Sequence, residues 1–191
     1  HLLEIGKVDT EALGISFVPA EGERNIKYPY AIAKELGIPF VCIVDRDVFQ
    51  QYVHDKREKS LNDDGIPEYK PILKKGSPIL ELISEEGKKH LIEYWNNDQY
   101  AKVLEVLQGF NIISMRYAFE VDLVMCSSYC EAFCSQLNVR EEDRSSSYLL
   151  KSQGNAIKKY TLINGVLDDR GIQNLPKSYR QILNVIKEML D

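Results

Sequence analysis

The sequence is poor in the residues that build zinc sites. Its 191 residues include four cysteines and three histidines, and no two cysteines form a CxxC pair. Zinc sites usually need closer cysteine spacing and a second group of ligands. Cys126, Cys130 and Cys134 recur every four residues, which places them along one face of a helix. We interpret them as buried structural thiols in a reducing cytoplasm.

Long apolar runs and export signals are also missing. No apolar segment approaches the roughly 18 residues that a membrane span needs, and the start shows no signal peptide. We find no GxxxxGK(S/T) phosphate loop, no internal repeat and no low-complexity tract. These absences predict a cytoplasmic protein that makes no membrane contact and has no ATP-binding loop of this type.

The overall composition is that of an ordinary globular protein, with 44% hydrophobic and 28% charged residues. The length suffices for one domain that carries an insertion. The net charge of -5 disfavours a dedicated basic nucleic-acid module. It leaves room for an enzyme that acts on nucleic acid, because a metal site is built from acids and the metal brings positive charge.

The segment "IPFVCIVDRDVF" contains the strongest functional signal. Residues 40–44 show no polar alternation, which predicts a strand that is covered on both faces, as in a parallel sheet. Asp45 and Asp47 follow at its carboxyl end, the edge where α/β sheets bind ligands. Two carboxylates at i and i+2 on an extended segment point the same way and repel unless a cation lies between them. A hard cation such as Mg²⁺ fits this pair, while a turn with a helix cap is the structural alternative.

The surrounding elements predict an α/β fold. Residues 15–20 read as a strand, residues 28–37 as a helix with Pro29 in its first turn and Gly37 at its end, and residues 38–44 as the next strand. Together they predict a right-handed βαβ unit.

The rest of the chain is predominantly helical. Residues 48–78 read as a surface excursion, residues 85–107 as two amphipathic helical pieces, and residues 110–119 as a strand. We predict three further helices: one that begins near Asp122, one that includes residues 155–167, and one that starts at Pro176.

Other charged residues stand near the ends of predicted elements. Glu21 and Glu23 follow the first strand, where a solvated loop is the plainer interpretation. Asp122 opens a helix, and an acid there also complements the helix dipole.

The segment "GISFVPAEGERNIKYPYAIAKELGIPFVCIVDRDVF" resembles a Toprim domain of the kind found in OLD (overcoming lysogenization defect) family nucleases. Gly22, Asn25, "LGIP" at 36–39 and "DRD" at 45–47 carry the resemblance, and "FEVDLVM" at 119–125 resembles a later segment of that family. The resemblance covers residues 13–50 and, more loosely, residues 112–130.

This resemblance implies an α/β fold with a Toprim-like parallel-sheet core, flanked by helices, with a largely helical insertion and C-terminal extension. Residues 1–191 would then be a fragment of the catalytic domain. Its core would span residues 13–50 and 110–130, the helical insertion residues 78–108, and the helical C-terminal part residues 145–191.

The implied activity is phosphodiester cleavage in DNA with Mg²⁺ or Mn²⁺, for which two ions are expected. Asp45, Asp47 and Asp122 would be metal ligands, and Asp45 and a lysine would act in catalysis. Lys151, Lys158 and Lys159 are the candidates for this lysine. We select Lys158, because it begins the predicted apolar-periodic helix, while a solvated helix lysine is the structural alternative. Glu21, Glu23 and Lys151 would be supporting residues around the site. The family also implies a parent ATPase domain N-terminal to His1, through which alone ATP would bind. It further implies a homo-oligomer and a role in phage defence, for example as a Gabija-type nuclease subunit.

One family motif is missing. A Toprim domain normally begins with a strand that ends in Glu-Gly, but Glu4 is followed by Ile5 and no such motif precedes residue 15. We therefore expect a piece of a longer protein, which can be inactive alone. The alternatives are a degenerate Toprim fold for assembly or DNA docking, a primase or topoisomerase, and a response-regulator-like or phosphatase-like domain with a phosphorylated aspartate.

Overall fold

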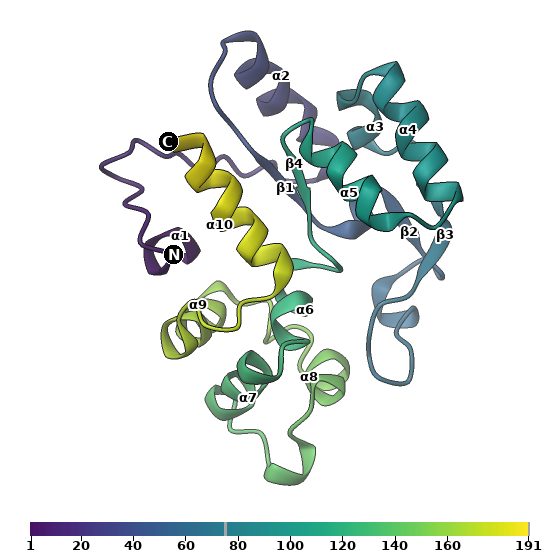
Figure 1. Ribbon diagram of the computed structural model, residues 1–191. Coiled ribbons are helices and arrows are strands. Elements are labelled where there is room, and N and C mark those ends of the chain that lie inside the picture. The colour runs from purple at the N-terminus through teal and green to yellow at the C-terminus, as the bar shows by residue number, and fades with distance from the viewer. Residues whose placement is uncertain (75, 191) are drawn as a thin grey trace.

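The computed structural model describes residues 1–74 and 76–190 and shows a mixed helix and strand fold (Figure 1). The strands are β1 (Cys42–Val44), β2 (Gln50–Tyr52), β3 (Tyr69–Leu73) and β4 (Ile112–Ser114). The helices are α1 (Leu2–Ile5), α2 (Lys27–Glu35), α3 (Pro78–Leu82), α4 (Glu85–Asn96), α5 (Tyr100–Gln108), α6 (Phe119–Val124), α7 (Ser127–Gln136), α8 (Ser146–Ser152), α9 (Tyr160–Arg170) and α10 (Lys177–Leu190).

The centre of the molecule is a parallel pair formed by β1 and β4, in which Cys42 pairs with Ile112 and Val44 with Ser114. Figure 1 shows α10 on one side of this pair and α5 on the other. Ile112 and Ile113 are both buried but belong to different hydrophobic cores. Successive side chains of a strand point to opposite faces, so β4 separates the two cores.

Each core is built around a different set of helices. The first contains buried residues of α6–α10 together with Leu3 and Val8 near the N-terminus. The second contains buried residues of α2, α3, α4 and α5 together with Val44 and Phe49. The DRD turn begins directly after Val44, so it lies where the two cores meet.

A second, antiparallel pair lies beside the first. β2 and β3 pair with Gln50 opposite Leu73 and Tyr52 opposite Tyr69, and the rings of Tyr52 and Tyr69 stack with centroids 4.9 Å apart. We predicted a surface excursion for residues 48–78, and the structure forms this hairpin within it. The hairpin follows the DRD turn directly and forms one wall of the site described below.

Most of the predicted helices are confirmed. α2 covers most of residues 28–37, with Gly37 at a φ of +64° just beyond its end, as a helix stop requires. Residues 78–108 contain α3, α4 and α5, and residues 145–190 contain α8, α9 and α10, so both ranges are largely helical as predicted. On α10 the predicted apolar stripe is buried at Ile182, Leu183 and Ile186.

The predicted strand at residues 15–20 is wrong. No strand forms there, and Phe17 and Val18 are 67% and 70% exposed. A strand is stabilised by a hydrogen-bonded neighbour, and within the described residues β1 pairs only with β4. The predicted right-handed βαβ unit is therefore wrong as well. β1 is shorter than predicted, and Ile43 is 40% exposed, so the strand is not covered on both faces.

Two helix boundaries also differ from the prediction. The single helix expected from near Asp122 is two helices, α6 and α7, which are separated by Met125 and Cys126. Lys158 does not begin a helix but lies in the turn before α9. No helix among the described residues is long and apolar enough to cross a membrane.

Candidate metal and phosphate site

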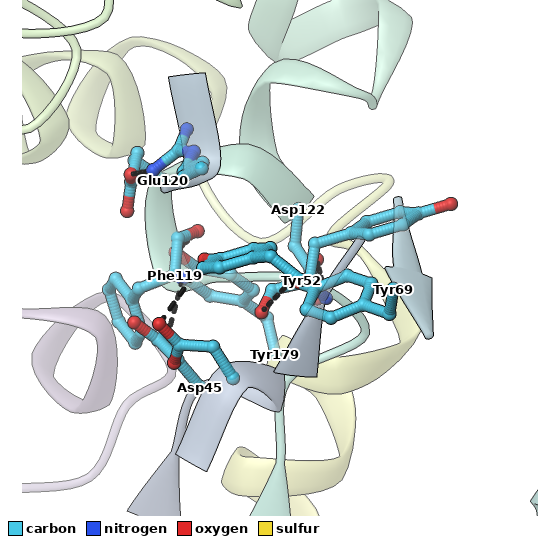
Figure 2. Close-up of polar contacts among 10 residues, drawn as sticks. Asp45, Tyr52, Tyr69, Phe119, Glu120, Asp122 and Tyr179 are labelled. Atoms are coloured by element: carbon cyan, nitrogen blue, oxygen red, sulfur yellow. Dashed lines mark hydrogen bonds and ion pairs between the residues drawn. The ribbon is translucent and has the colours of Figure 1, made fainter. Parts of the chain in front are cut away.

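The DRD turn places Asp45 against the start of α6. Asp45 leaves β1 in an extended conformation and a 3-10 turn follows at Arg46–Val48. The Phe119 backbone N–H donates to Asp45 Oδ1 over 3.1 Å, as the dashed line in Figure 2 shows. Tyr179 Oη of α10 donates to the Phe119 carbonyl oxygen over 2.7 Å. Asp45 is therefore held between the carboxyl ends of the two parallel strands and α10.

Arg46 anchors the turn on the opposite side. Its guanidinium lies over the rings of Tyr69 and Tyr100, 4.8 and 4.6 Å from their centroids. Its Nε donates to Gln50 Oε1, and Gln50 Nε2 donates to the Lys70 carbonyl oxygen over 2.7 Å. The residue between the two aspartates is thus fastened to the β2–β3 hairpin and to α5, which restrains Asp45 and Asp47.

Asp47 is held by the hairpin and linked to the loop before α2. Tyr52 Oη donates to Asp47 Oδ2 over 3.2 Å. Lys74 Nζ donates to the Asp47 carbonyl oxygen over 3.3 Å and forms an ion pair with Glu23 at 2.6 Å. Glu23 therefore supports the DRD turn through Lys74, whereas Glu21 is exposed at a φ of +52°.

A surface cavity of about 450 Å³ opens beside these aspartates. It brings together three residues that the sequence singled out, Asp45, Asp47 and Lys158, although Lys158 is more than a hundred residues away along the chain. The structure does not bring Glu21, Glu23, Asp122 or Lys151 into this lining. The cavity is lined by Asp45, Asp47, Tyr52, Asp55, Lys56, Arg57, Glu58, Ala118, Glu120 and Lys158.

Glu120 is the residue that sequence reasoning missed. It lies in the first turn of α6 with its side chain only 10% exposed, and it forms an ion pair with Arg57. The signal in the sequence was the acidic pair in "FEVDL", from which we chose Asp122. Two residues along an α-helix are separated by roughly 200° of rotation, so Glu120 and Asp122 face opposite sides of α6. Only Glu120 faces the cavity.

Asp122 points into the protein and fastens the turn after β4. Its carboxylate accepts the N–H groups of Arg116 and Tyr117 over 2.9 Å each and the Ser178 hydroxyl over 2.6 Å (Figure 2). These contacts tie the turn and α6 to α10. The structure thus gives Asp122 a position and a set of partners different from those expected of a metal ligand.

We expect Asp122→Ala to lower the free energy of unfolding by about 2–4 kcal/mol, because it leaves two backbone N–H groups and a buried hydroxyl without an acceptor. Urea denaturation measures this change. Ser178→Ala removes only one of the hydrogen bonds and is expected to cost about 1 kcal/mol. If Asp122→Ala has the same free energy of unfolding as the unsubstituted protein, these hydrogen bonds do not stabilise the turn.

The N-terminal segment, which contains the DRD turn, is similar to a known protein family. Residues 1–47 match the model of the overcoming lysogenization defect protein-like Toprim domain, and the match includes Asp45 and Asp47. This segment is therefore similar to an OLD-like Toprim domain. No curated protein and no solved structure gives a significant match. The Toprim match ends at residue 47, so it does not include Glu120, Asp122 or Lys158.

Closely spaced carboxylates dominate the electrostatics of the DRD turn. The pKa of Asp45 is raised from 3.8 to about 7, chiefly by burial and in addition by the charges of Glu120 and Asp47, against the lowering effect of the Phe119 N–H. Asp45 thus lies close enough to two other carboxylates for each to disfavour its ionisation. A cation among the three would remove this penalty, since it favours the charged forms.

The donor set suits a hard divalent cation, because Asp45, Asp47 and Glu120 offer carboxylate oxygens. Within residues 1–74 and 76–190, however, no group of three or more His, Cys, Asp or Glu side chains is already arranged to hold an ion. The reason lies in their present partners: Phe119 holds Asp45, Tyr52 holds Asp47 and Arg57 holds Glu120. Joint binding by the three would require the Glu120–Arg57 pair to open.

Proposed function

We propose that this chain is the Toprim part of a nuclease that hydrolyses phosphodiester bonds in DNA with Mg²⁺ or Mn²⁺. One observation carries the proposal: the carboxylates that follow the carboxyl ends of β1 and β4, those of Asp45, Asp47 and Glu120, line one cavity together with Lys158. Acidic residues that gather at this edge of a parallel sheet are typical of a ligand site. The Toprim match over residues 1–47 supports the nuclease class.

The residues divide into two roles. Asp45, Asp47 and Glu120 would hold the cation, with Tyr52 orienting Asp47 and the Phe119 N–H orienting Asp45. A bound divalent cation supplies a more acidic water and a positive charge against the phosphate oxygens. Lys158 reaches the same cavity from the turn before α9. Its ammonium would offset the negative charge that grows on the phosphate during hydrolysis.

The finer assignments follow the family resemblance. We propose that the β1–β4 pair belongs to a Toprim sheet with its core in residues 13–50 and 110–130. The helices of residues 78–108 and 145–191 would then be an insertion and a C-terminal extension. An ATPase domain of a longer parent, a homo-oligomer and a Gabija-type role in phage defence belong to the same proposal.

A specific observation favours a second candidate, a degenerate Toprim fold that serves assembly or DNA docking. Glu120 and Arg57 form an ion pair with side chains only 10% and 13% exposed. Opening such a pair is costly, because it leaves an uncompensated charge of low exposure. If the pair stays closed, Glu120 is not available to a cation, and only Asp45 and Asp47 of the three proposed ligands remain.

The test is a calorimetric Mn²⁺ titration of the protein and of the Asp45→Ala/Asp47→Ala double variant, together with a plasmid-nicking assay. We expect Mn²⁺ binding by the protein, no measurable heat with the double variant, and nicking reduced to background. Circular dichroism of both proteins controls for folding. Absence of Mn²⁺ binding, with equal nicking by both proteins, would reject the nuclease and favour the docking module.

A further inference from the structure

A second and larger cavity, of about 740 Å³, adjoins the carboxylate cavity. One wall comes from the loop at residues 57–63 and the other from residues 150–159, at the end of α8 and in the turn before α9. Arg57, Glu58 and Lys158 line both cavities. The two cavities therefore share a boundary, and a ligand longer than a single phosphate group can extend from one into the other.

The second cavity carries more positive than negative side chains. Lys151, Lys158 and Lys159 line it against Glu58 and Asp63, in addition to the Arg57 that pairs with Glu120. Lys158 and Lys159 are exposed, and neither forms an ion pair with any residue that the structure describes. Their charges are thus available to an external anion, although the chain as a whole has a net charge of -5.

The loop wall is held in place before any ligand arrives. Asn62 Oδ1 accepts the N–H groups of Asp64 and Ile66, 2.9 Å away in each case. Lys151 Nζ of α8 donates to the Asp63 carbonyl oxygen across the cavity. Gly65 has a φ of +78°, and a Cβ there would lie 3.2 Å from Leu150 Cβ, so the loop packs closely against α8. A fixed wall reduces the entropy lost on binding.

We propose that this second cavity binds the phosphodiester backbone of the DNA strand that adjoins the cleaved phosphate, with Lys151 and Lys159 as phosphate contacts. The proposal rests on the proposed nuclease function. It assigns the acidic cavity to the reacting phosphate and the basic cavity to the neighbouring phosphates. Because lysines at a cavity wall contact the backbone and no base edges, the binding is independent of sequence.

The test uses Lys159, which is exposed and makes no ion pair, in the variants Lys159→Ala and Lys159→Glu. Binding of a short fluorescein-labelled DNA duplex is measured by fluorescence anisotropy in EDTA, between about 50 and 200 mM salt. The loss of one phosphate contact is expected to make the negative slope of log K against log salt shallower by about 0.9. It is also expected to lower the affinity near 0.1 M salt by about eightfold. Lys159→Glu is expected to bind more weakly still.

Lys89→Ala is the matched control, because Lys89 is an exposed lysine on α4 outside both cavities. It is expected to leave the affinity and the slope unchanged. Lys159 variants that bind like Lys89→Ala, or a protein that does not bind the duplex at all, would overturn the proposal.

Calorimetric Mn²⁺ titrations separate this result from the proposed function. The Lys159 variants are expected to bind Mn²⁺ as the unsubstituted protein does, since Lys159 does not line the carboxylate cavity. If the unsubstituted protein does not bind Mn²⁺, the nuclease function is rejected, whatever the result of the duplex-binding measurement. If the Lys159 variants bind both Mn²⁺ and the duplex as the unsubstituted protein does, only the proposal that the second cavity binds the DNA backbone is rejected.

Discussion

Glu120→Gln is expected to lower plasmid nicking by roughly 100-fold or more and to weaken Mn²⁺ binding at least tenfold. Glutamine keeps the shape of the side chain but removes the charge of one of the three proposed metal ligands. The substitution also leaves Arg57 without its carboxylate partner, so a moderate loss of stability accompanies the loss of activity. Nicking assays and calorimetry at the same pH measure the two effects.

Asp122→Asn is the matched control on the same helix. Asp122 lies on the other side of α6 and is bound by Arg116, Tyr117 and Ser178. We expect it to lower the melting temperature and to leave the Mn²⁺ affinity of the folded protein unchanged. The reverse pattern, with Mn²⁺ binding lost in Asp122→Asn and retained in Glu120→Gln, would restore Asp122 as the ligand that the sequence pattern indicated.

The stability of the metal-free protein is expected to fall as the pH rises from about 4 to about 7. The pKa of Asp45 is raised from 3.8 to about 7 in the folded protein, chiefly by burial. Between these values the folded protein keeps a proton that the unfolded chain has lost, so raising the pH favours unfolding. The decrease in the free energy of unfolding is at most about 4 kcal/mol, and it is complete once Asp45 is ionised in the folded state.

Urea denaturation at a series of pH values in EDTA measures this dependence. Asp45→Asn cannot ionise and is expected to remove it, whereas Asp55→Asn, at an exposed position lining the same cavity, is expected to keep it. Added Mn²⁺ is expected to stabilise the protein more at pH 8 than at pH 5, because a cation competes with the proton for the carboxylates. A pH profile of Asp45→Asn that matches the unsubstituted protein would assign the dependence to other groups.

Local patterns predicted most of the helices, and the predicted strand at residues 15–20 shows where they fail. Pro29 and Gly37 bracket a helix in the sequence, and α2 forms there because its hydrogen bonds are internal to the segment. "ISFVPA" has the composition of a strand, yet Phe17 and Val18 remain exposed. A strand depends on a partner that its own sequence does not encode.

The sequence by itself determined the DRD turn. An apolar run that ends in two aspartates predicts a strand end with two carboxylates, and Asp45 and Asp47 lie together at one cavity. That inference needs only the position of the two acids at a strand end and the chemistry of neighbouring carboxylates. The extended conformation that we predicted for both acids is wrong for Asp47, which lies in the 3-10 turn.

Only the tertiary structure decided which distant residues join them. The rotation of α6, set by the hydrogen bonds of Asp122 to the turn and to Ser178, directs Glu120 toward the cavity and Asp122 away from it. Lys158 reaches the cavity from a turn, although the sequence predicted a helix there. Both placements depend on the packing of α6 against α8 and of α10 against β4, and such long-range packing leaves no local pattern in the sequence.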